Sequence, residues 1–194
     1  MNLPNKLTTS RLALTGMFLW VMFSRSPIND TLDLVFICFA AITDYLDGKI
    51  ARSRNLITNF GVLMDPLADK VMIAAAFICL VPLKAIPAWV VIVIVSREFL
   101  ITGLRLLAAG RGVVLQAERL GKHKALWQIV TAGYFLLLLA LMEWERAGWV
   151  SLHVRQWWWP AWRYGGWTLA GVALVLTLYS GIGYLRKHRD LIAE

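Results

Sequence analysis

Four aspartates lie beside strongly apolar stretches of the chain, and their spacing could serve metal chemistry. Asp44 and Asp47 are three residues apart, whereas Asp65 and Asp69 are four apart. Either spacing places both side chains of a pair on one face of a helix, because successive helical residues are rotated by about 100°. The connection between the pairs, residues 53–60, is short. We therefore expect two antiparallel neighbouring helices whose aspartate pairs converge.

Converging carboxylates repel one another, and an aspartate within a membrane span costs roughly 2.5–3.5 kcal/mol. A divalent cation removes both penalties, and an all-carboxylate set favours a hard ion such as Mg²⁺ or Mn²⁺. Four carboxylates can hold two such ions about 3.5–4 Å apart, an arrangement that clamps phosphoryl groups. Taken singly, Asp65 before Pro66 could be a helix N-cap and Asp47–Gly48 a turn. Only the metal site explains the matched spacings on two adjacent helix ends.

Small residues and one arginine accompany the aspartates. Gly48, Ala51 and Gly61 remove bulk there, which permits either close helix packing or close approach of a flat ligand. Arg52 could bind a diphosphate through its guanidinium group, or it could be an ordinary cytoplasmic-side anchor.

The composition predicts an integral membrane protein. Of the 194 residues, 59% are hydrophobic and only 16% are charged, against about 25% charged residues in a soluble domain. Six segments are apolar and roughly long enough, at about 20 residues, to span a bilayer. They cover approximately residues 7–23, 32–51, 66–83, 87–109, 120–142 and 167–185. We expect a single all-α membrane domain over residues 1–194, with six transmembrane helices and a cytoplasm-facing polar cavity.

The distribution of basic residues predicts the orientation in the membrane. Lys and Arg gather on one set of connections, which places both termini and the aspartates on the cytoplasmic side. The net charge of +8 fits anionic lipid headgroups better than nucleic acid, because the basic residues flank apolar segments. The other set of connections includes the tryptophan-rich residues 144–167. We interpret these tryptophans as an interfacial belt or a surface-lying segment, with substrate stacking as the weaker alternative.

A small metal-ion transporter or channel would also place acidic residues in membrane helices. It would need carboxylates near the middle of the bilayer, along a path through both leaflets. All four aspartates of the two pairs lie toward one surface, and we expect no acidic residue in the opposite half of their helices. An enzyme site at one membrane surface is therefore favoured.

The aspartate stretch resembles the motif of the CDP-alcohol phosphotransferase family. The positions that match the motif in residue type and spacing are Asp44, Asp47, Gly48, Ala51, Arg52, Gly61, Asp65 and Asp69. The resemblance implies a six-helix membrane enzyme that uses a divalent metal. Such enzymes transfer a phosphoalkyl group from a CDP-linked donor to an alcohol and release CMP.

Three further stretches resemble the bacterial members of this family that use glycerol 3-phosphate as acceptor. They are NLPNKLTTSRLAL, VSREFLITGLRLLAAGRGVV and LGKHKALWQIV. With the central motif, the resemblance covers roughly residues 2–135. It implies CDP-diacylglycerol as donor, a homodimer and a location in the bacterial inner membrane. Within the family, inositol phosphate, serine or a second phosphatidylglycerol are alternative acceptors.

The resemblance also implies roles for individual residues. Asp44, Asp47 and Asp65 would bind the metal pair, and Asp69 would contact a metal or act as general base toward the acceptor hydroxyl. The donor nucleotide would lie near Gly48, Ala51, Arg52 and Gly61, with Asn5 and Thr8 as weaker contacts.

Basic residues further along the chain predict a pocket for the acceptor phosphate. Arg97 lies within an apolar segment and Arg105 follows eight residues later, nearly on the same helical face. An arginine inside a membrane span is a functional candidate by default. Lys122, Lys124 and Arg11 could complete the pocket, or could be ordinary cytoplasmic-side anchors. Glu98 would offset part of the positive charge, and such a pocket argues against serine as acceptor.

Overall fold

The computed structural model describes residues 3–24, 28–54, 59–113 and 119–189. For residues 3–8, 11, 43–54, 59–69, 119–120 and 122 the description covers the backbone alone. The described chain is helical and contains no β-strand. Its elements are α1 (Leu3–Phe23), α2 (Asn29–Arg54), α3 (Asn59–Leu80), α4 (Ala88–Gly110), α5 (Arg119–Arg146), α6 (Val154–Pro160), a π-helical turn η1 (Ala161–Gly165) and α7 (Gly166–Lys187).

Each apolar segment of the sequence coincides largely with one of the six long helices. Two stretches, His123–Arg146 and Val154–Lys187, are long and apolar enough to cross a bilayer by themselves. Shorter apolar stretches occur at Leu12–Phe23 and Lys70–Leu80. The all-α prediction is thus confirmed for the described residues, and the apolar helices suit a membrane protein.

Two helix boundaries differ from those expected. The third helix begins at Asn59, so Asp65 lies inside it and the N-cap interpretation is wrong. Proline favours the first turn of a helix, but the apolar residues before Pro66 extend α3 upstream of it. In the tryptophan-rich segment, α6 continues through η1 into α7. That segment therefore belongs in large part to the last helix.

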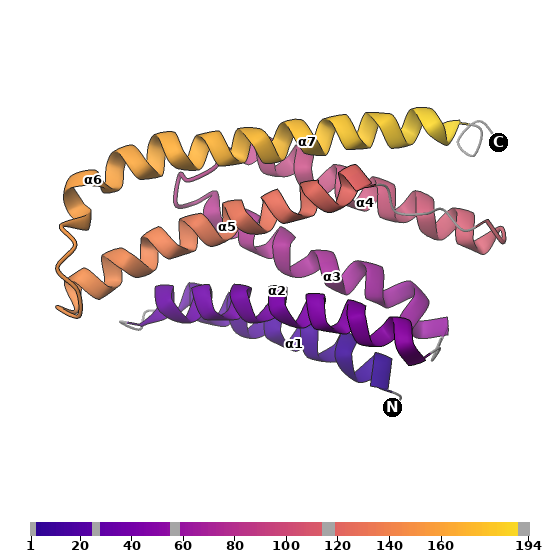
Figure 1. The fold of residues 1–194 in the computed structure, drawn as a ribbon, viewed down its shortest axis with the longest axis horizontal. Coiled ribbons are helices and arrows are strands. Elements are labelled where there is room, and N and C mark those ends of the chain that lie inside the picture. Colours follow the sequence, from indigo (N-terminus) through magenta and orange to yellow (C-terminus); the bar gives the residue numbers. More distant parts are fainter. Residues whose placement is uncertain (1–2, 25–27, 55–58, 114–118, 190–194) are drawn as a thin grey trace.

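The helices form an elongated antiparallel bundle (Figure 1). α5 packs against α2 and α7, α3 packs against α1 and α4, and α4 packs against α7. α1 begins and α7 ends at the same end of the bundle (Figure 1), where α2 and α4 end and α3 and α5 begin. We call this the motif end. The opposite end, where α5 ends and α6 begins, is called the tryptophan end.

The bundle buries polar groups and exposes apolar ones. Its core contains large apolar side chains such as Phe18, Phe77 and Phe135, but ten polar or charged residues of the described chain are also buried. The outer surface presents large apolar side chains on every long helix, including Trp20 and Tyr179. Soluble monomers rarely expose extended apolar surface, so lipid is the solvent that suits this exterior.

A hydrogen-bonded contact ties α2 to α5 at the tryptophan end. The carboxylate of Glu143 on α5 accepts hydrogen bonds from the Thr31 backbone N at 2.9 Å and from Thr31 Oγ1 at 3.2 Å. Trp144 Nε1 donates to Thr31 Oγ1 at 2.7 Å. Because the first backbone N–H groups of a helix lack partners within it, Glu143 acts as a cap for α2.

Asp33, one turn into α2, corrects an expectation from the sequence. It lies in the half of α2 opposite the motif aspartates, where no acidic residue was expected. Its side chain is fully buried, and neither carboxylate oxygen has a hydrogen-bond partner within the described structure. Acidic residues thus occur toward both ends of α2, although Asp33 does not line the cavity described below.

Replacing Asp33 with valine is expected to stabilise the protein. A buried polar group without a partner costs about 1–3 kcal/mol, and valine fills similar space without that cost. Thermal unfolding in detergent should show a melting temperature several degrees above that of the wild type. Asp33→Asn is the matched control: it keeps an unpaired polar group and should gain less. A lower melting temperature for Asp33→Val would show that the carboxyl group has a stabilising partner.

Candidate functional site

The motif aspartates lie on α2, which ends at the motif end of the bundle, and on α3, which begins there. Asp44 and Asp47 belong to the C-terminal half of α2, and Asp65 and Asp69 to the N-terminal half of α3. The backbone is helical through all four positions, so each pair keeps the spacing that puts two residues on one face. Their side chains lie outside the described part of the structure, and their convergence stays a prediction.

For several other predicted site residues the structure likewise describes only the backbone. Their backbones lie in α1, α2, α3 and α5, and their side chains are outside the described residues. They are Asn5, Thr8, Arg11, Gly48, Ala51, Arg52, Gly61 and Lys122.

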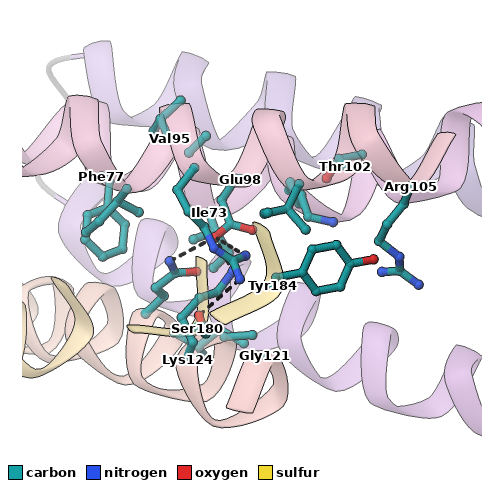
Figure 2. A pocket seen from close by; sticks show the side chains of 18 residues that line it. Ile73, Phe77, Val95, Glu98, Thr102, Arg105, Gly121, Lys124, Ser180 and Tyr184 are labelled. Atoms are coloured by element: carbon teal, nitrogen blue, oxygen red, sulfur yellow. Dashed lines mark hydrogen bonds and ion pairs between the residues drawn. The ribbon is translucent and has the colours of Figure 1, made fainter. Parts of the chain in front are cut away.

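A cavity of about 290 Å³ lies between α3, α4, α5 and α7 (Figure 2). Lys70, which directly follows Asp69 in α3, lines it. The cavity also reaches Arg105 near the end of α4, Gly121 near the start of α5 and Tyr184 near the end of α7. It therefore lies toward the motif end.

The walls of the cavity are positively charged overall. Three of the residues predicted to bind the acceptor phosphate, Arg97, Arg105 and Lys124, line it together. Lys70 adds a fourth cationic side chain, whereas Glu98 is the one carboxylate among the lining residues. An anionic ligand with more than one negative charge suits this lining best, because the low-dielectric surroundings strengthen its attraction to the cations.

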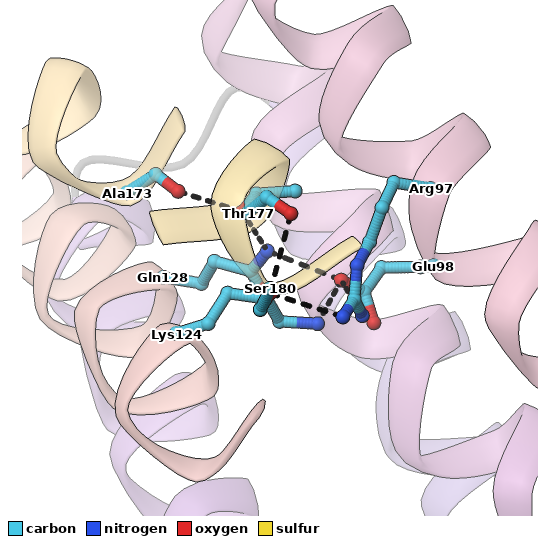
Figure 3. A network of polar contacts seen from close by, with 7 residues as sticks. All are labelled: Arg97, Glu98, Lys124, Gln128, Ala173, Thr177 and Ser180. Atoms are coloured by element: carbon cyan, nitrogen blue, oxygen red, sulfur yellow. Dashed lines mark hydrogen bonds and ion pairs between the residues drawn. The ribbon is translucent and has the colours of Figure 1, made fainter. Parts of the chain in front are cut away.

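Glu98 organises the basic residues through a buried network (Figure 3). Its Oε1 atom accepts a hydrogen bond from Lys124 Nζ in a close ion pair, and another from Gln128 Nε2 at 3.4 Å. Arg97 Nη1 lies 3.6 Å from the same oxygen. The Lys124 side chain is only 4% exposed, and such a buried charge needs a partner. Lys124 is thus one partner of an ion pair with Glu98, whereas the sequence indicated only that Glu98 offsets part of the positive charge.

α7 contributes the remaining polar contacts. Arg97 Nη2 donates to Ser180 Oγ at 3.0 Å, and Gln128 Nε2 donates to Thr177 Oγ1 at 3.3 Å. In Figure 2 the phenol of Tyr184 lies between this group and Arg105. Sequence analysis missed these α7 residues. A usable signal existed, because Thr177, Ser180 and Tyr184 are spaced by three and four residues in an otherwise apolar helix and therefore share one face.

Comparison with known proteins identifies the family. The family model described as CDP-alcohol phosphatidyltransferase matches residues 1–179. The chain belongs to this family. The match includes the whole aspartate motif and the α3, α4 and α5 walls of the cavity, and it ends before Ser180 and Tyr184.

Three relatives illustrate the members of the family that the chain is similar to. A Bacillus subtilis protein named CDP-diacylglycerol–glycerol-3-phosphate 3-phosphatidyltransferase is 44% identical over 148 residues, which cover 70% of this chain and 77% of that protein. A Mycobacterium tuberculosis protein named probable phosphatidylglycerophosphate synthase is 34% identical, covering 98% and 83%. A Streptomyces coelicolor protein named cardiolipin synthase (CMP-forming) is 30% identical, covering 99% and 85%.

CDP-alcohol phosphatidyltransferases are generally metal-dependent, and the motif residues fit a metal by their chemistry. Four carboxylates on two helices are a donor set for hard divalent cations. The described side chains, which do not include these four, contain no group of three or more His, Cys, Asp and Glu residues that could hold a metal ion. The assignment of a metal to the four aspartates stays a prediction.

Proposed function

We propose that this protein transfers the phosphatidyl group of CDP-diacylglycerol to glycerol 3-phosphate, giving phosphatidylglycerol phosphate and CMP. One observation carries the proposal: Lys70, which lines the cationic cavity, directly follows Asp69 of the aspartate motif in α3. This adjacency supports a site for a phosphorylated acceptor beside a donor site at the aspartates. The names of the Bacillus subtilis and Mycobacterium tuberculosis relatives support the same reaction.

The cavity suits the acceptor in charge and in size. Glycerol 3-phosphate carries a phosphate dianion, which the guanidinium groups of Arg97 and Arg105 can bind through paired hydrogen bonds. Lys70 adds a point charge, and the ion pair with Glu98 limits the contribution of Lys124. A volume of about 290 Å³ accommodates a three-carbon phosphate. Lys122 and Arg11 are proposed to complete the phosphate contacts from the motif end.

The aspartates are proposed to hold two Mg²⁺ or Mn²⁺ ions through Asp44, Asp47, Asp65 and Asp69. When bound, these ions would neutralise charge on the diphosphate of the donor. Arg52 would bind the same diphosphate with its guanidinium group, whereas Gly48, Ala51 and Gly61 would leave space for the cytidine. Asn5 and Thr8 on α1 are proposed as additional donor contacts.

Asp69 is proposed to take the proton from the acceptor hydroxyl. The hydroxyl oxygen then attacks the phosphorus that carries the diacylglycerol oxygen, and a new P–O bond forms there. The anhydride bond to the second phosphorus breaks, and its electron pair leaves with CMP. Arg97 and Arg105 would hold the acceptor in line for this attack by fixing its phosphate.

We place the protein in the bacterial inner membrane, as one domain of six membrane-spanning helices that functions as a homodimer among membrane lipids. The long helices have 21 to 28 residues, or about 32–42 Å at 1.5 Å per residue, enough for a 30 Å hydrocarbon core. α1 begins and α7 ends at the motif end (Figure 1), where basic residues are concentrated. Both termini, the cavity and the active site are therefore assigned to the cytoplasmic side.

A cardiolipin synthase activity is the second candidate, because one similar protein carries that name. Its acceptor, phosphatidylglycerol, has a phosphodiester with a single negative charge, which makes less use of the cationic cavity. Inositol phosphate would match the charge but is bulkier.

A panel of acceptors distinguishes these activities. Purified protein with CDP-diacylglycerol and Mg²⁺ or Mn²⁺ is expected to release CMP with glycerol 3-phosphate at least tenfold faster than with inositol phosphate, serine or phosphatidylglycerol. Omitting the acceptor controls for hydrolysis of the donor, and chelation of the metal should stop release. CMP release with phosphatidylglycerol or inositol phosphate but not with glycerol 3-phosphate would replace the proposed acceptor.

A further inference from the structure

α7 holds the guanidinium group of Arg97 by a directed hydrogen bond (Figure 3). The hydroxyl of Ser180 donates its proton to the Thr177 carbonyl oxygen at 3.2 Å. Its oxygen is thereby left to accept the hydrogen bond from Arg97 Nη2 at 3.0 Å. Ser180 is buried, so water does not compete freely for this bond. The hydroxyl is thus oriented as an acceptor for the guanidinium.

The next residue, Gly181, leaves room for the stem of the same arginine. A Cβ atom at Gly181 would lie 3.0 Å from Arg97 Cγ and 3.2 Å from Arg97 Nε. The Arg97 side chain therefore crosses α7 directly against its backbone. Gly183 on the same helix differs, because a Cβ atom there would meet nothing within 4 Å.

Arg97 is also held from its other side. Nη1 lies 3.6 Å from Glu98 Oε1, and Glu98 is fixed in turn by Lys124 and Gln128. An arginine side chain has several rotatable bonds, and fixing them before a ligand binds removes an entropic cost of binding. The contacts from α4 and α7 together point to preorganisation of the guanidinium.

We propose that Ser180 and Gly181 are positioning residues of the acceptor site, which hold Arg97 at the wall of the cavity and so set the affinity for the acceptor phosphate. Both residues lie beyond residue 179, where the family match ends. The inference rests on the proposed function, in which Arg97 binds glycerol 3-phosphate. In this proposal α7 is a wall of the cavity that sets acceptor affinity, in addition to a membrane-spanning helix.

Steady-state kinetics of CMP release test this role. Gly181→Ala is expected to raise the KM for glycerol 3-phosphate about tenfold, because the added methyl group displaces Arg97. Ser180→Ala, which adds no volume, should raise it about fivefold to tenfold. Neither variant should change the KM for CDP-diacylglycerol more than twofold, and kcat at saturating acceptor should stay within about threefold of the wild type. Gly183→Ala, the matched control, should leave all three parameters within twofold.

A double-variant cycle shows whether the effect passes through Arg97. In an Arg97→Ala background, which removes the atoms that a Cβ at Gly181 would meet, Gly181→Ala should alter the acceptor KM less than twofold. If Gly181→Ala does not fold, the same comparison is made with Ser180→Ala. The KM for glycerol 3-phosphate is then measured for Ser180→Ala with and without Arg97→Ala.

The outcomes separate this inference from the proposed function. Wild-type protein that releases no CMP with glycerol 3-phosphate would refute the proposed function itself. With an active wild type, the positioning role is overturned if Gly181→Ala and Ser180→Ala match Gly183→Ala. It is also overturned if they change the KM values of both substrates alike, or if their effects persist in the Arg97→Ala background.

Discussion

Asp69→Asn is expected to lower the rate of CMP release about a thousandfold at saturating CDP-diacylglycerol and glycerol 3-phosphate. The amide cannot take the proton of the acceptor hydroxyl, and general base catalysis contributes about 10²–10⁴ in rate. The change also removes one carboxylate from the proposed metal set. The measurement is CMP release in detergent micelles with excess Mg²⁺, so that weaker metal binding alone does not produce the loss.

Asp33→Asn is the matched control for this experiment. It removes a carboxylate from α2 near the tryptophan end, in a residue that does not line the cavity, and should leave CMP release within about twofold. A rate for Asp69→Asn within tenfold of the wild type would exclude Asp69 as the general base. Equal losses in both variants would show that carboxylates at the two ends of the bundle are equally needed, contrary to a site at the motif end.

Lys124→Met is expected to lower the free energy of unfolding by about 3–5 kcal/mol, because it leaves Glu98 as a buried carboxylate without its main partner. Both residues are buried and form a close ion pair between α4 and α5. Thermal unfolding in detergent should show a melting temperature about 10 °C lower.

The control is a second substitution that should restore the stability lost in Lys124→Met. Glu98→Gln in the Lys124→Met background removes the unpaired charge and should recover most of the lost stability. Arg186→Met, at an exposed position of α7, should change the melting temperature by less than about 2 °C. If Lys124→Met is as stable as the wild type, or if Glu98→Gln does not restore it, the pair does not have the energetic role assigned to it.

The sequence predicts the elements and the motif well because these depend on local patterns. Runs of apolar residues identify six long helices, and spacings of three and four residues place each aspartate pair on one helical face. The start of α3 is mispredicted because Pro66 is a typical first-turn residue, yet the helix passes through it. Asp33 lies at the start of the second apolar segment, and its burial depends on how the helices pack.

The structure of the cavity depends on contacts that no spacing reveals. Glu98 and Lys124 are 26 residues apart, and Arg97 and Ser180 are 83 apart. Such pairs are decided by which helices pack together, and a single sequence does not specify this. The sequence could indicate Arg97, Arg105 and Lys124 as candidates, the last of which could equally be a membrane anchor, but it could not show that they line one cavity. Packing of α4 and α5 against α7 brings them into one cavity.

Phosphatidyl transfer to glycerol 3-phosphate is tested most directly by measuring whether the acceptor becomes part of the lipid product. Purified protein in vesicles containing CDP-diacylglycerol is supplied with Mg²⁺ and glycerol 3-phosphate labelled in its carbon skeleton. We expect label to enter the lipid phase in one-to-one proportion to the CMP released, as a lipid that retains the phosphomonoester. Release of CMP without labelled lipid, or labelled lipid formed without CMP, would contradict phosphatidyl transfer to glycerol 3-phosphate.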